Sequence, residues 1–556
     1  MTPRARSRWA WIALVGALAG LALPPPALGQ PLDAGPLHAA ARPAHEADDA
    51  GAASDPGDAS SGAPLLDASA ANARAASADA AVSPGSRAPP TPSLRRRSTG
   101  SVARVTLGLF ALLALVILGG SPAVRAFERR AGLTMVIGSG LPFLLLGVVA
   151  RRPEVGILDD ATLRDLTPVL EFGLAWIGFR VGADFDVRAM DRWPRGTARV
   201  MGAESACAFL VVVVVMGLAL QAGLHPVNAV RNALILGACA AVSAPTGVRA
   251  MEAAGLLPAG PARDLRRVAA LDDVAGVLVL GLVTSAFRPA GVGAWVLPPL
   301  GWLFLQLGMG VVHGALLVSA VRVARTANER FALTLGAIAF SAGMAGYVGF
   351  SPLVVGAVAG VVVANLPSAA EAGGLISAAR HRAFERPIFM SFFVVTGALW
   401  DPTNRVGWAL VPVYVTARLM GKLLGLRAAR AAAAELAVAS APPPSPPPAE
   451  GAPAPVRVGV SVRAAWMALM PTSAVSIAVI VSVRALYPTV LSGALETVVI
   501  LGALFAELAF RASLSLAGGK APEGADLGAL PIEHEALDTP SAPPPPPPSP
   551  GTEPPP

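Results

Sequence analysis

The chain has 556 residues, of which 54% are hydrophobic and only 14% are charged, with a formal net charge of +7. Soluble globular domains carry about 25% charged residues, so this composition excludes an ordinary soluble protein and indicates an integral membrane protein. The basic residues form no concentrated patch that would indicate nucleic-acid binding.

The N-terminus has the pattern of a secretory signal peptide. Arginines at positions 4, 6 and 8 precede an apolar stretch at 9–23, and small residues follow at 27–29. We therefore predict a signal peptide at 1–29, with an uncleaved anchor as the alternative. Cleavage at this place puts the mature N-terminus outside the cytoplasm.

Three segments are too poor in apolar residues to form a core. Residues 30–100 are rich in Ala, Ser, Pro, Gly and Asp, and we predict a disordered extracytoplasmic arm there. Residues 429–462 are expected to be a Pro-rich cytoplasmic loop, and 515–556 a disordered cytoplasmic tail.

The remainder is expected to be a membrane transporter domain, with spans 1 to 11 at 101–428 and spans 12 and 13 at 463–514. A helix needs about 20 apolar residues to cross a bilayer. Thirteen segments approach this length, at about 104–120, 131–150, 165–183, 197–221, 229–253, 265–287, 297–321, 330–348, 351–366, 386–400, 407–426, 464–485 and 488–511. We predict an all-α membrane protein with 13 transmembrane helices.

Arginine placement predicts the orientation of these spans. If residue 30 lies outside, the inside loops carry far more arginines than the outside loops, as the positive-inside rule requires. We expect a multi-pass protein of the bacterial inner membrane, with the N-terminus outside and the C-terminus in the cytoplasm.

Two adjacent acids, Asp272 and Asp273, lie in an otherwise apolar run. An ionisable group at the centre of a membrane helix costs about 2.5 to 3.5 kcal/mol on insertion scales, so such residues usually face a partner or an ion path. Neighbouring helix positions differ by about 100°, so the two carboxylates face different surroundings and take different roles. The structural alternative is a pair held by Arg266 or Arg267.

Lys422 is one of only two lysines among 43 basic residues, the other being Lys520. Lys can lose its proton when desolvated, whereas Arg cannot, so we interpret Lys422 as a required counter-ion at a depth similar to that of Asp272. Snorkelling toward the interface is the alternative role, and Arg418, one turn deeper, is a second candidate counter-ion. Two further acids, Glu204 and Glu507, lie at comparable depth, so depth alone does not choose a partner.

Two predicted spans contain helix-breaking sequences, at 240–247 and 469–474. Proline removes a helix hydrogen bond, and broken helices at corresponding places in two halves point to a transporter binding site. Proline kinks without function are the alternative. The hydroxyl groups near these breaks are therefore candidate ion ligands: Ser243, Thr246, Thr472 and Ser473.

The sequence resembles the monovalent cation/proton antiporter superfamily, in particular bacterial Na+/H+ antiporters with 13 spans. The resemblance covers about 104–514 and is carried by Ala270–Leu280, Ser243–Arg249, Arg386–Gly397 and Gly421–Lys422. It implies an inverted-repeat antiporter fold with two broken crossing helices, and a homodimer. It also implies that Asp273 binds cation and proton alternately while Asp272 pairs with Lys422.

The favoured function is exchange of Na+ for H+ by competition at the Asp pair, with K+/H+ exchange as the runner-up, and the expected partners are Na+ (or K+ or Li+) and H+. A Na+-coupled organic-anion carrier is the less favoured alternative. The sequence shows no nucleophile and base set, so an enzyme is not expected, and we expect no cofactor and no metal beyond the transported cation. A lysine that releases its proton during the cycle would make the exchange electrogenic, which is the stoichiometry that the sequence favours.

Overall fold

The computed structural model describes residues 140–190, 195–223, 226–288, 297–366, 378–439, 461–487 and 490–518, together with Phe110 and Ala114. These residues form helices joined by turns, without a strand among them. The predicted signal peptide, the arm at 30–100 and nearly all of the first span lie outside the described residues, as do most of the Pro-rich loop and of the tail.

The helices follow the predicted spans in order. They are α5 (Leu141–Arg151), α6 (Asp160–Asp165), α7 (Thr167–Ala183), α8 (Val187–Met190), α9 (Arg195–Gln221), α10 (Pro226–Ala241), α11 (Pro245–Ala253), α12 (Ala259–Ala286), α13 (Pro299–Val323), α14 (Ala327–Val348), α15 (Pro352–Asn365), α17 (Ala378–Leu399), α18 (Arg405–Ala439), α19 (Val462–Ala468), α20 (Ala474–Leu486) and α21 (Val490–Leu516).

Each predicted span from 165–183 onward falls on one helix or on two consecutive helices. Seven of the described helical segments are long and apolar enough to cross a membrane, and four shorter apolar helices accompany them. The count of thirteen stays a prediction, because nearly all of 104–120 and the first part of 131–150, up to residue 139, lie outside the described residues. One helix is longer than predicted: α18 continues to Ala439, beyond the expected end at 426.

Local sequence explains where several helices begin. Thr326 caps α14 by accepting a hydrogen bond from the N–H of Glu329, whose carboxylate bonds back to the Thr326 N–H in a capping box. Ser351 and Ser461 cap α15 and α19, each by accepting a hydrogen bond from the backbone N–H three residues later. Proline follows the cap of α15 at its first position, where its missing N–H is not needed.

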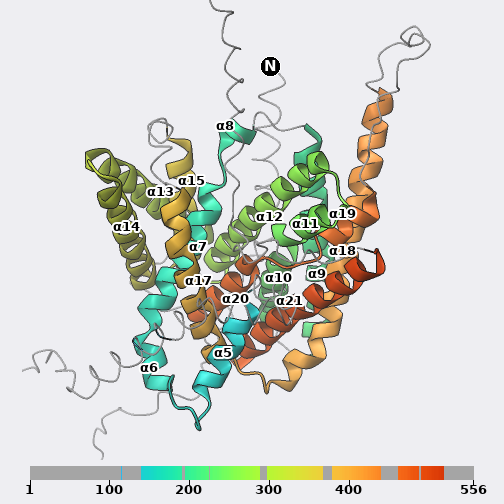
Figure 1. The fold of residues 1–556 in the computed structure, drawn as a ribbon. Coiled ribbons are helices and arrows are strands. Elements are labelled where there is room, and N and C mark those ends of the chain that lie inside the picture. Colours follow the sequence, from blue (N-terminus) through green and yellow to red (C-terminus); the bar gives the residue numbers. More distant parts are fainter. Residues whose placement is uncertain are drawn as a thin grey trace, which may run out of the picture. The chain divides into compact units, whose positions relative to one another are not determined.

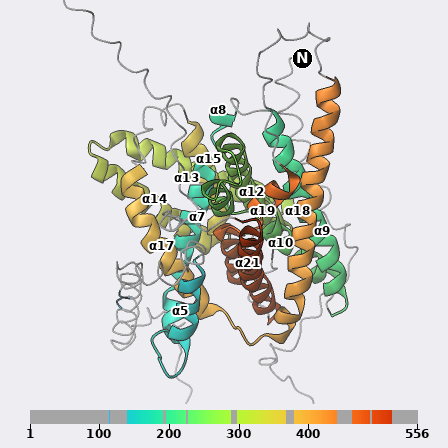
Figure 2. The same cartoon turned by 45° about the vertical axis from the view of Figure 1, so that its right-hand side comes forward.

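The helices form two groups (Figure 1). In the first, which we call the panel group, α7 packs along α15 and α5 along α17, with α6, α13 and α14 beside them. In the second, the core group, α9 packs along α18, and α10, α11, α12, α19, α20 and α21 complete the group. Figure 2 shows the same division from a second direction. The two groups meet mainly through α12 and α20.

The core group contains two interrupted helices that pass each other. The first runs through α10 and α11 and the second through α19 and α20. Because α10 packs on α20 while α11 packs on α19, the two interrupted helices run in opposite directions. This is the arrangement expected of two inverted halves, and it brings the two breaks together.

Candidate functional site: a crossing of two broken helices

The breaks lie close to the predicted places, at residues 242–244 and 469–473. Ala244 and Ser473 both have extended backbone conformations at the start of the following half-helix. The N–H of Ala244 donates to the carbonyl of Pro471 at 2.9 Å, which joins the two breaks directly. Gly247 permits this approach, since a Cβ atom there would lie 2.4 Å from the carbonyl oxygen of Ala468.

Arg418 of α18 bonds to the carbonyls that the breaks leave free. Its Nη1 donates to Met470 O at 2.7 Å and its Nη2 donates to Val242 O at 2.9 Å, and the residue is only 1% exposed. Buried carbonyls without partners are costly, so this guanidinium stabilises both breaks. The side chain predicted as a second counter-ion therefore binds backbone oxygens, and forms no ion pair with an acid within the described part of the chain.

Lys422, one helical turn further along α18, binds Glu204 rather than Asp272. The Lys422 ammonium forms an ion pair with the Glu204 carboxylate of α9, and both side chains are fully buried. It also donates to Ser243 Oγ at 2.7 Å and to Ala241 O at 3.1 Å. The direct pair of Asp272 with Lys422 that the resemblance implied is not formed, because α9 places Glu204 against the ammonium and Ser243 lies between Lys422 and Asp272.

Asp272 is held by two hydroxyl groups. Ser243 Oγ lies 2.9 Å from Oδ2, and Ser205 Oγ of α9 bonds to Oδ1. A lysine ammonium can only donate, so the Ser243 hydroxyl accepts from Lys422 and directs its own hydrogen to Asp272. The aspartate is thus linked to Lys422 through one serine.

Asp273 faces a different neighbour, as the helix geometry predicted. Its Oδ2 accepts a hydrogen bond from Ser473 Oγ at 3.1 Å, at the start of α20. Its Oδ1 is buried and has no hydrogen-bond partner in the described structure. The hydroxyl of Thr472, the residue before Ser473, is likewise buried and without a partner. Two buried oxygens without partners, Asp273 Oδ1 and Thr472 Oγ1, thus belong to residues at or bonded to the second break.

The structure brings together seven of the eight site residues predicted from the sequence, and Thr246 is the exception. Thr246 lies half-buried in the first turn of α11 and makes no contact with the acids among the described hydrogen bonds. The others are Ser243, Asp272, Asp273, Arg418, Lys422, Thr472 and Ser473.

Sequence reasoning missed two residues of the site, Glu204 and Ser205. Both lie on α9, inside an apolar segment from Arg199 to Gln221 that is long enough to cross a membrane. An acid in such a segment usually has a functional role, and the position of Glu204 therefore indicated one. The sequence does not show that α9 packs along α18. This packing places Glu204, rather than another acid, next to Lys422.

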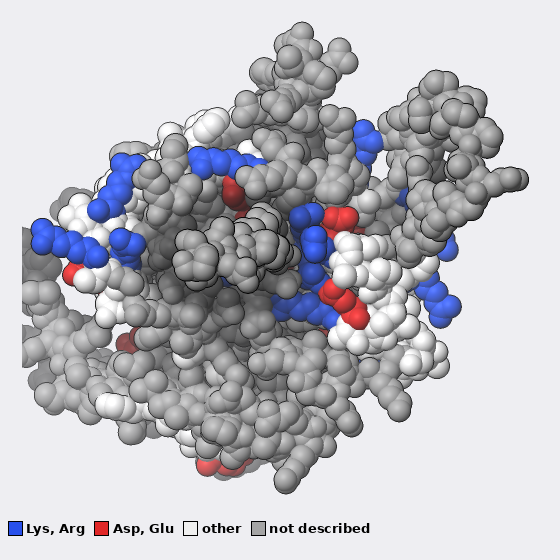
Figure 3. Space-filling view, turned by 45° about the horizontal axis from the view of Figure 1, so that its top comes forward, with Lys and Arg blue, Asp and Glu red and all other residues white. Residues whose placement is uncertain are grey.

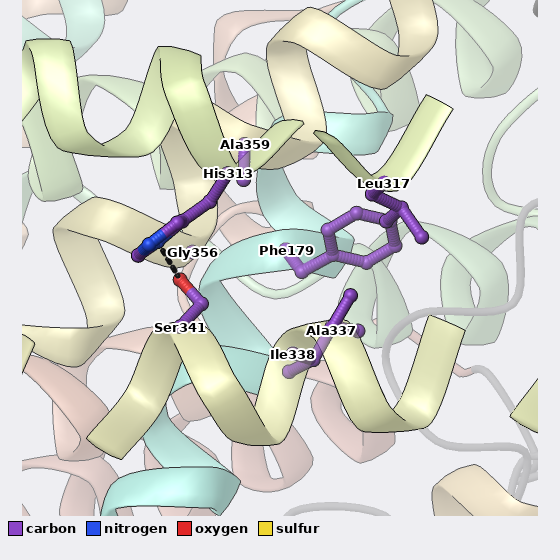
Figure 4. Close-up of a pocket in the computed structure, with 8 residues that line it drawn as sticks. All are labelled: Phe179, His313, Leu317, Ala337, Ile338, Ser341, Gly356 and Ala359. Carbon is purple, nitrogen blue, oxygen red and sulfur yellow. Dashed lines mark hydrogen bonds between the residues drawn. The ribbon is translucent and has the colours of Figure 1, made fainter. Parts of the chain in front are cut away.

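A small pocket lies elsewhere, between α13 and α14 of the panel group (Figure 4). His313 and Ser341 are hydrogen-bonded within it at 2.9 Å, and the other lining residues are apolar. It contains none of the predicted site residues. No group of three or more His, Cys, Asp and Glu residues in the described ranges has an arrangement that holds a metal ion.

The fold and the crossing define an all-helical membrane transporter. The family described as "Sodium/hydrogen exchanger, transmembrane" matches residues 109–514. Since this match covers most of the chain, the protein belongs to the sodium/hydrogen exchanger family. It is therefore a multi-pass membrane protein that exchanges monovalent cations for protons, and a transporter rather than an enzyme.

Two solved structures are similar to this chain. The sodium proton antiporter MjNhaP1 from Methanocaldococcus jannaschii at pH 8 matches with a TM-score of 0.52 at 15% identity, covering 78% of this chain and 100% of the other. A three-dimensional electron microscopy map of the same antiporter matches with a TM-score of 0.48 at 16% identity, covering 74% and 99%. At this identity the first match establishes the fold alone. No curated protein sequence matches the chain.

Proposed function

We propose that the protein exchanges Na+ for H+ by competition at the carboxylate of Asp273. The observation that carries the proposal is the buried, unpaired Oδ1 of this half-buried acid, which lies on α12 beside the break between α19 and α20. A cation and a proton compete for the same carboxylate, so binding of one requires release of the other. If the site faces one side of the membrane at a time, that competition couples the two fluxes.

Ser473 and Thr472 are the proposed additional ligands. Ser473 already donates to Asp273, and its oxygen lone pairs are available to a cation after the hydroxyl rotates. The unpaired hydroxyl of Thr472 supplies another oxygen. Hard monovalent and divalent cations prefer such oxygen ligands. Asp272 has both oxygens engaged, and we assign it to the support of Ser243 and Lys422 rather than to direct cation binding.

The orientation in the membrane is also a proposal. Helix ends on the side of α8 carry many arginines, for example Arg188, Arg266, Arg267 and Arg427, and Figure 3 looks obliquely onto this end. By the positive-inside rule this side is cytoplasmic, which places the C-terminus inside and the N-terminus outside a bacterial inner membrane. We further propose that the protein forms a homodimer through its panel group.

Ion-dependent proton movement in proteoliposomes tests the function. An outward Na+ gradient should drive proton uptake in the wild type, and Asp273→Asn should abolish it, because an amide cannot alternate between a protonated and a cation-bound carboxylate. Parallel gradients of Li+ and K+ establish the preferred ion, and faster exchange with K+ would favour the K+/H+ alternative.

Asp264→Asn is the matched control for this experiment. Asp264 lies on the same helix as Asp273 but is about half exposed, and it pairs with Arg267 at 3.1 Å near the end of the helix. Its loss should leave exchange unchanged. Continued exchange by Asp273→Asn at normal protein levels would exclude Asp273 as the shared site.

A further inference from the structure

Arg288 attaches the outer end of α12, in the orientation proposed above, to the panel group. This half-buried arginine lies just after α12 ends at Ala286. Its Nη2 donates to the carbonyl of Val348 at 2.7 Å, and its Nη1 donates to the carbonyl of Gly349 at 3.2 Å. Val348 is the last residue of α14 and Gly349 is its C-cap. The helix that carries Asp273 is thus joined to a helix of the panel group.

The chemistry of the guanidinium suits this place. The last carbonyls of a helix have no partner within it, and the helix dipole favours a cation there. The guanidinium of Arg288 also lies over two aromatic rings of the panel group. Its Cζ is 4.0 Å from the centre of the Trp302 ring and 4.9 Å from that of Phe350. Arginine makes both kinds of contact at once because its guanidinium is planar and carries several N–H donors, which lysine cannot match.

The boundary between the two groups is closed beside this attachment. Ser285 of α12 donates to Gln306 of α13 at 3.2 Å, and the hydroxyls of Ser482 in α20 and Ser351 at the start of α15 are 2.6 Å apart. All four residues are at most 5% exposed. Solvent therefore does not reach the boundary at these contacts.

Asp273 lies farther in along the same helix. Ser285 follows it by about 12 residues, which is about 18 Å at 1.5 Å per residue. An ion that moves along the boundary from the outer side must therefore pass the closed contacts before it reaches Asp273. For the site to open to that side, the outer ends of α12 and α20 must separate from α13, α14 and α15.

We propose that Arg288 is a latch that holds the outer side of the exchanger closed, and that its release from Val348 and Gly349 is a step of each transport cycle. This inference rests on the exchange proposed at Asp273, because coupled exchange requires the site to face each side of the membrane in turn. The described contacts of Arg288 are all with the panel group, so they are lost together when α12 moves away. Arg288 is a positioning residue: it touches neither ion, and it sets the balance between the inward-open and outward-open conformers.

The KM for Na+ on each side of the membrane tests the latch. The apparent affinity of a site falls with the fraction of protein in the conformer that can bind. Arg288→Gln should therefore lower the KM severalfold on the outer side, measured in right-side-out vesicles, and raise it on the inner side, measured in everted vesicles. Arg288→Lys keeps the charge without the planar fork and should give intermediate values. Unchanged KM values, or a change in the same direction on both sides, would overturn the proposal.

Cysteine labelling tests the closed boundary without reference to ion binding. Ser285→Cys places a thiol at the buried contact with Gln306, in a chain whose two native cysteines, Cys207 and Cys239, are replaced by alanine. A membrane-impermeant maleimide should label it severalfold faster in right-side-out vesicles once Arg288→Gln is added. An equal labelling rate, or a rise confined to everted vesicles, rules out an outer latch. Since labelling does not need Asp273, exchange that survives Asp273→Asn would remove the proposed function and leave this result intact.

Arg231→Gln is the matched control. Arg231 of α10 is likewise a half-buried arginine near the outer end, and its Cζ lies 4.7 Å from the centre of the Tyr487 ring. Tyr487 is the C-cap of α20, so this contact lies within the core group. The control should keep the wild-type KM on both sides and the wild-type labelling rate, and a control that behaves like Arg288→Gln would refute a specific latch. If Arg288→Gln does not reach the membrane, Arg288→Lys serves for both measurements, with smaller changes in the same directions.

Discussion

The ammonium of Lys422 and the carboxylate of Glu204 form an ion pair with both side chains fully buried, joining α18 to α9. The two residues are 218 positions apart in the chain. Breaking a buried ion pair by removing one partner is strongly destabilising, because it leaves the other charge uncompensated. The pair is therefore as much a structural element of the core group as a part of the site.

The first prediction concerns this pair. Lys422→Met should lower the free energy of unfolding by about 3 to 5 kcal/mol, because Glu204 remains buried without its cation. The thermal midpoint of the purified protein in detergent measures the loss. Adding Glu204→Gln in the same chain should recover a large part of it, and a single variant that melts like the wild type would contradict the pairing.

The second prediction separates Thr472 from its neighbour. The Thr472 hydroxyl is buried without a hydrogen bond, and such an unpaired group costs about 1 to 3 kcal/mol, so Thr472→Val should raise rather than lower the free energy of unfolding. If the hydroxyl binds Na+, the KM for Na+ should rise severalfold. Ser473→Ala should also weaken Na+ binding, but it should cost about 1 kcal/mol in addition, because Ser473 caps α20. An unchanged KM in Thr472→Val would remove Thr472 from the ligand set.

The third prediction tests the close contact at the crossing. Gly247→Ala places a Cβ atom 2.4 Å from Ala468 O and 2.8 Å from the ring of Pro471. Overpacking of this kind costs about 1 to 3 kcal/mol, and here it pushes the two broken helices apart. The control is Gly260→Ala in the first turn of α12, where no atom lies within 4 Å of the added Cβ. Equal thermal midpoints for the two variants would show that the contact is dispensable.

The fourth prediction concerns pH and the turn between α17 and α18. The Thr403 hydroxyl, at 2.7 Å, and then its backbone N–H, at 3.0 Å, lower the pKa of exposed Asp401 below its ordinary value of 3.8. A lowered pKa means that ionised Asp401 stabilises the folded state above 3.8 and that this contribution disappears as the pH falls through the lowered pKa.

Asp401→Asn should therefore melt below the wild type at neutral pH, with the difference closing on acidification below 3.8. Thermal midpoints of both proteins over this pH range measure the effect. A difference that widens toward low pH would reverse the predicted sign. Transport at neutral pH should be unaffected, since Asp401 lies outside the site.

Helix geometry and proline chemistry made much of the site predictable. The 100° step between adjacent helix positions predicted different surroundings for the two aspartates, and the structure places Asp272 against Ser243 and Asp273 against Ser473. The prolines at 245 and 471 predicted both breaks. Each of these features is determined by a few neighbouring residues, so it can be predicted from the local sequence.

The partner of Lys422 was not predictable in the same way. Three acids lie at similar depth along their helices: Glu204, Asp272 and Glu507. The sequence gives this depth but does not give the direction in which each side chain points. Which of them reaches the ammonium depends on how α9, α12 and α21 rotate and pack around α18. That is a property of the assembled helices, as is the absence of a described hydrogen bond between the Thr246 hydroxyl and the acids.

Arg418 has a consequence for ion selection. Because its guanidinium and the Ala244 N–H already bond to the carbonyls of Val242, Met470 and Pro471, the crossing is held together before any ion arrives. Ligands that are ordered in advance avoid the entropy of arranging them on binding. If an ion binds at the proposed site, it must then shed its water shell against oxygens whose spacing is fixed. Discrimination among Li+, Na+ and K+ at the proposed site would then depend on ionic radius and dehydration energy, because the chain could rearrange little to bind a larger ion.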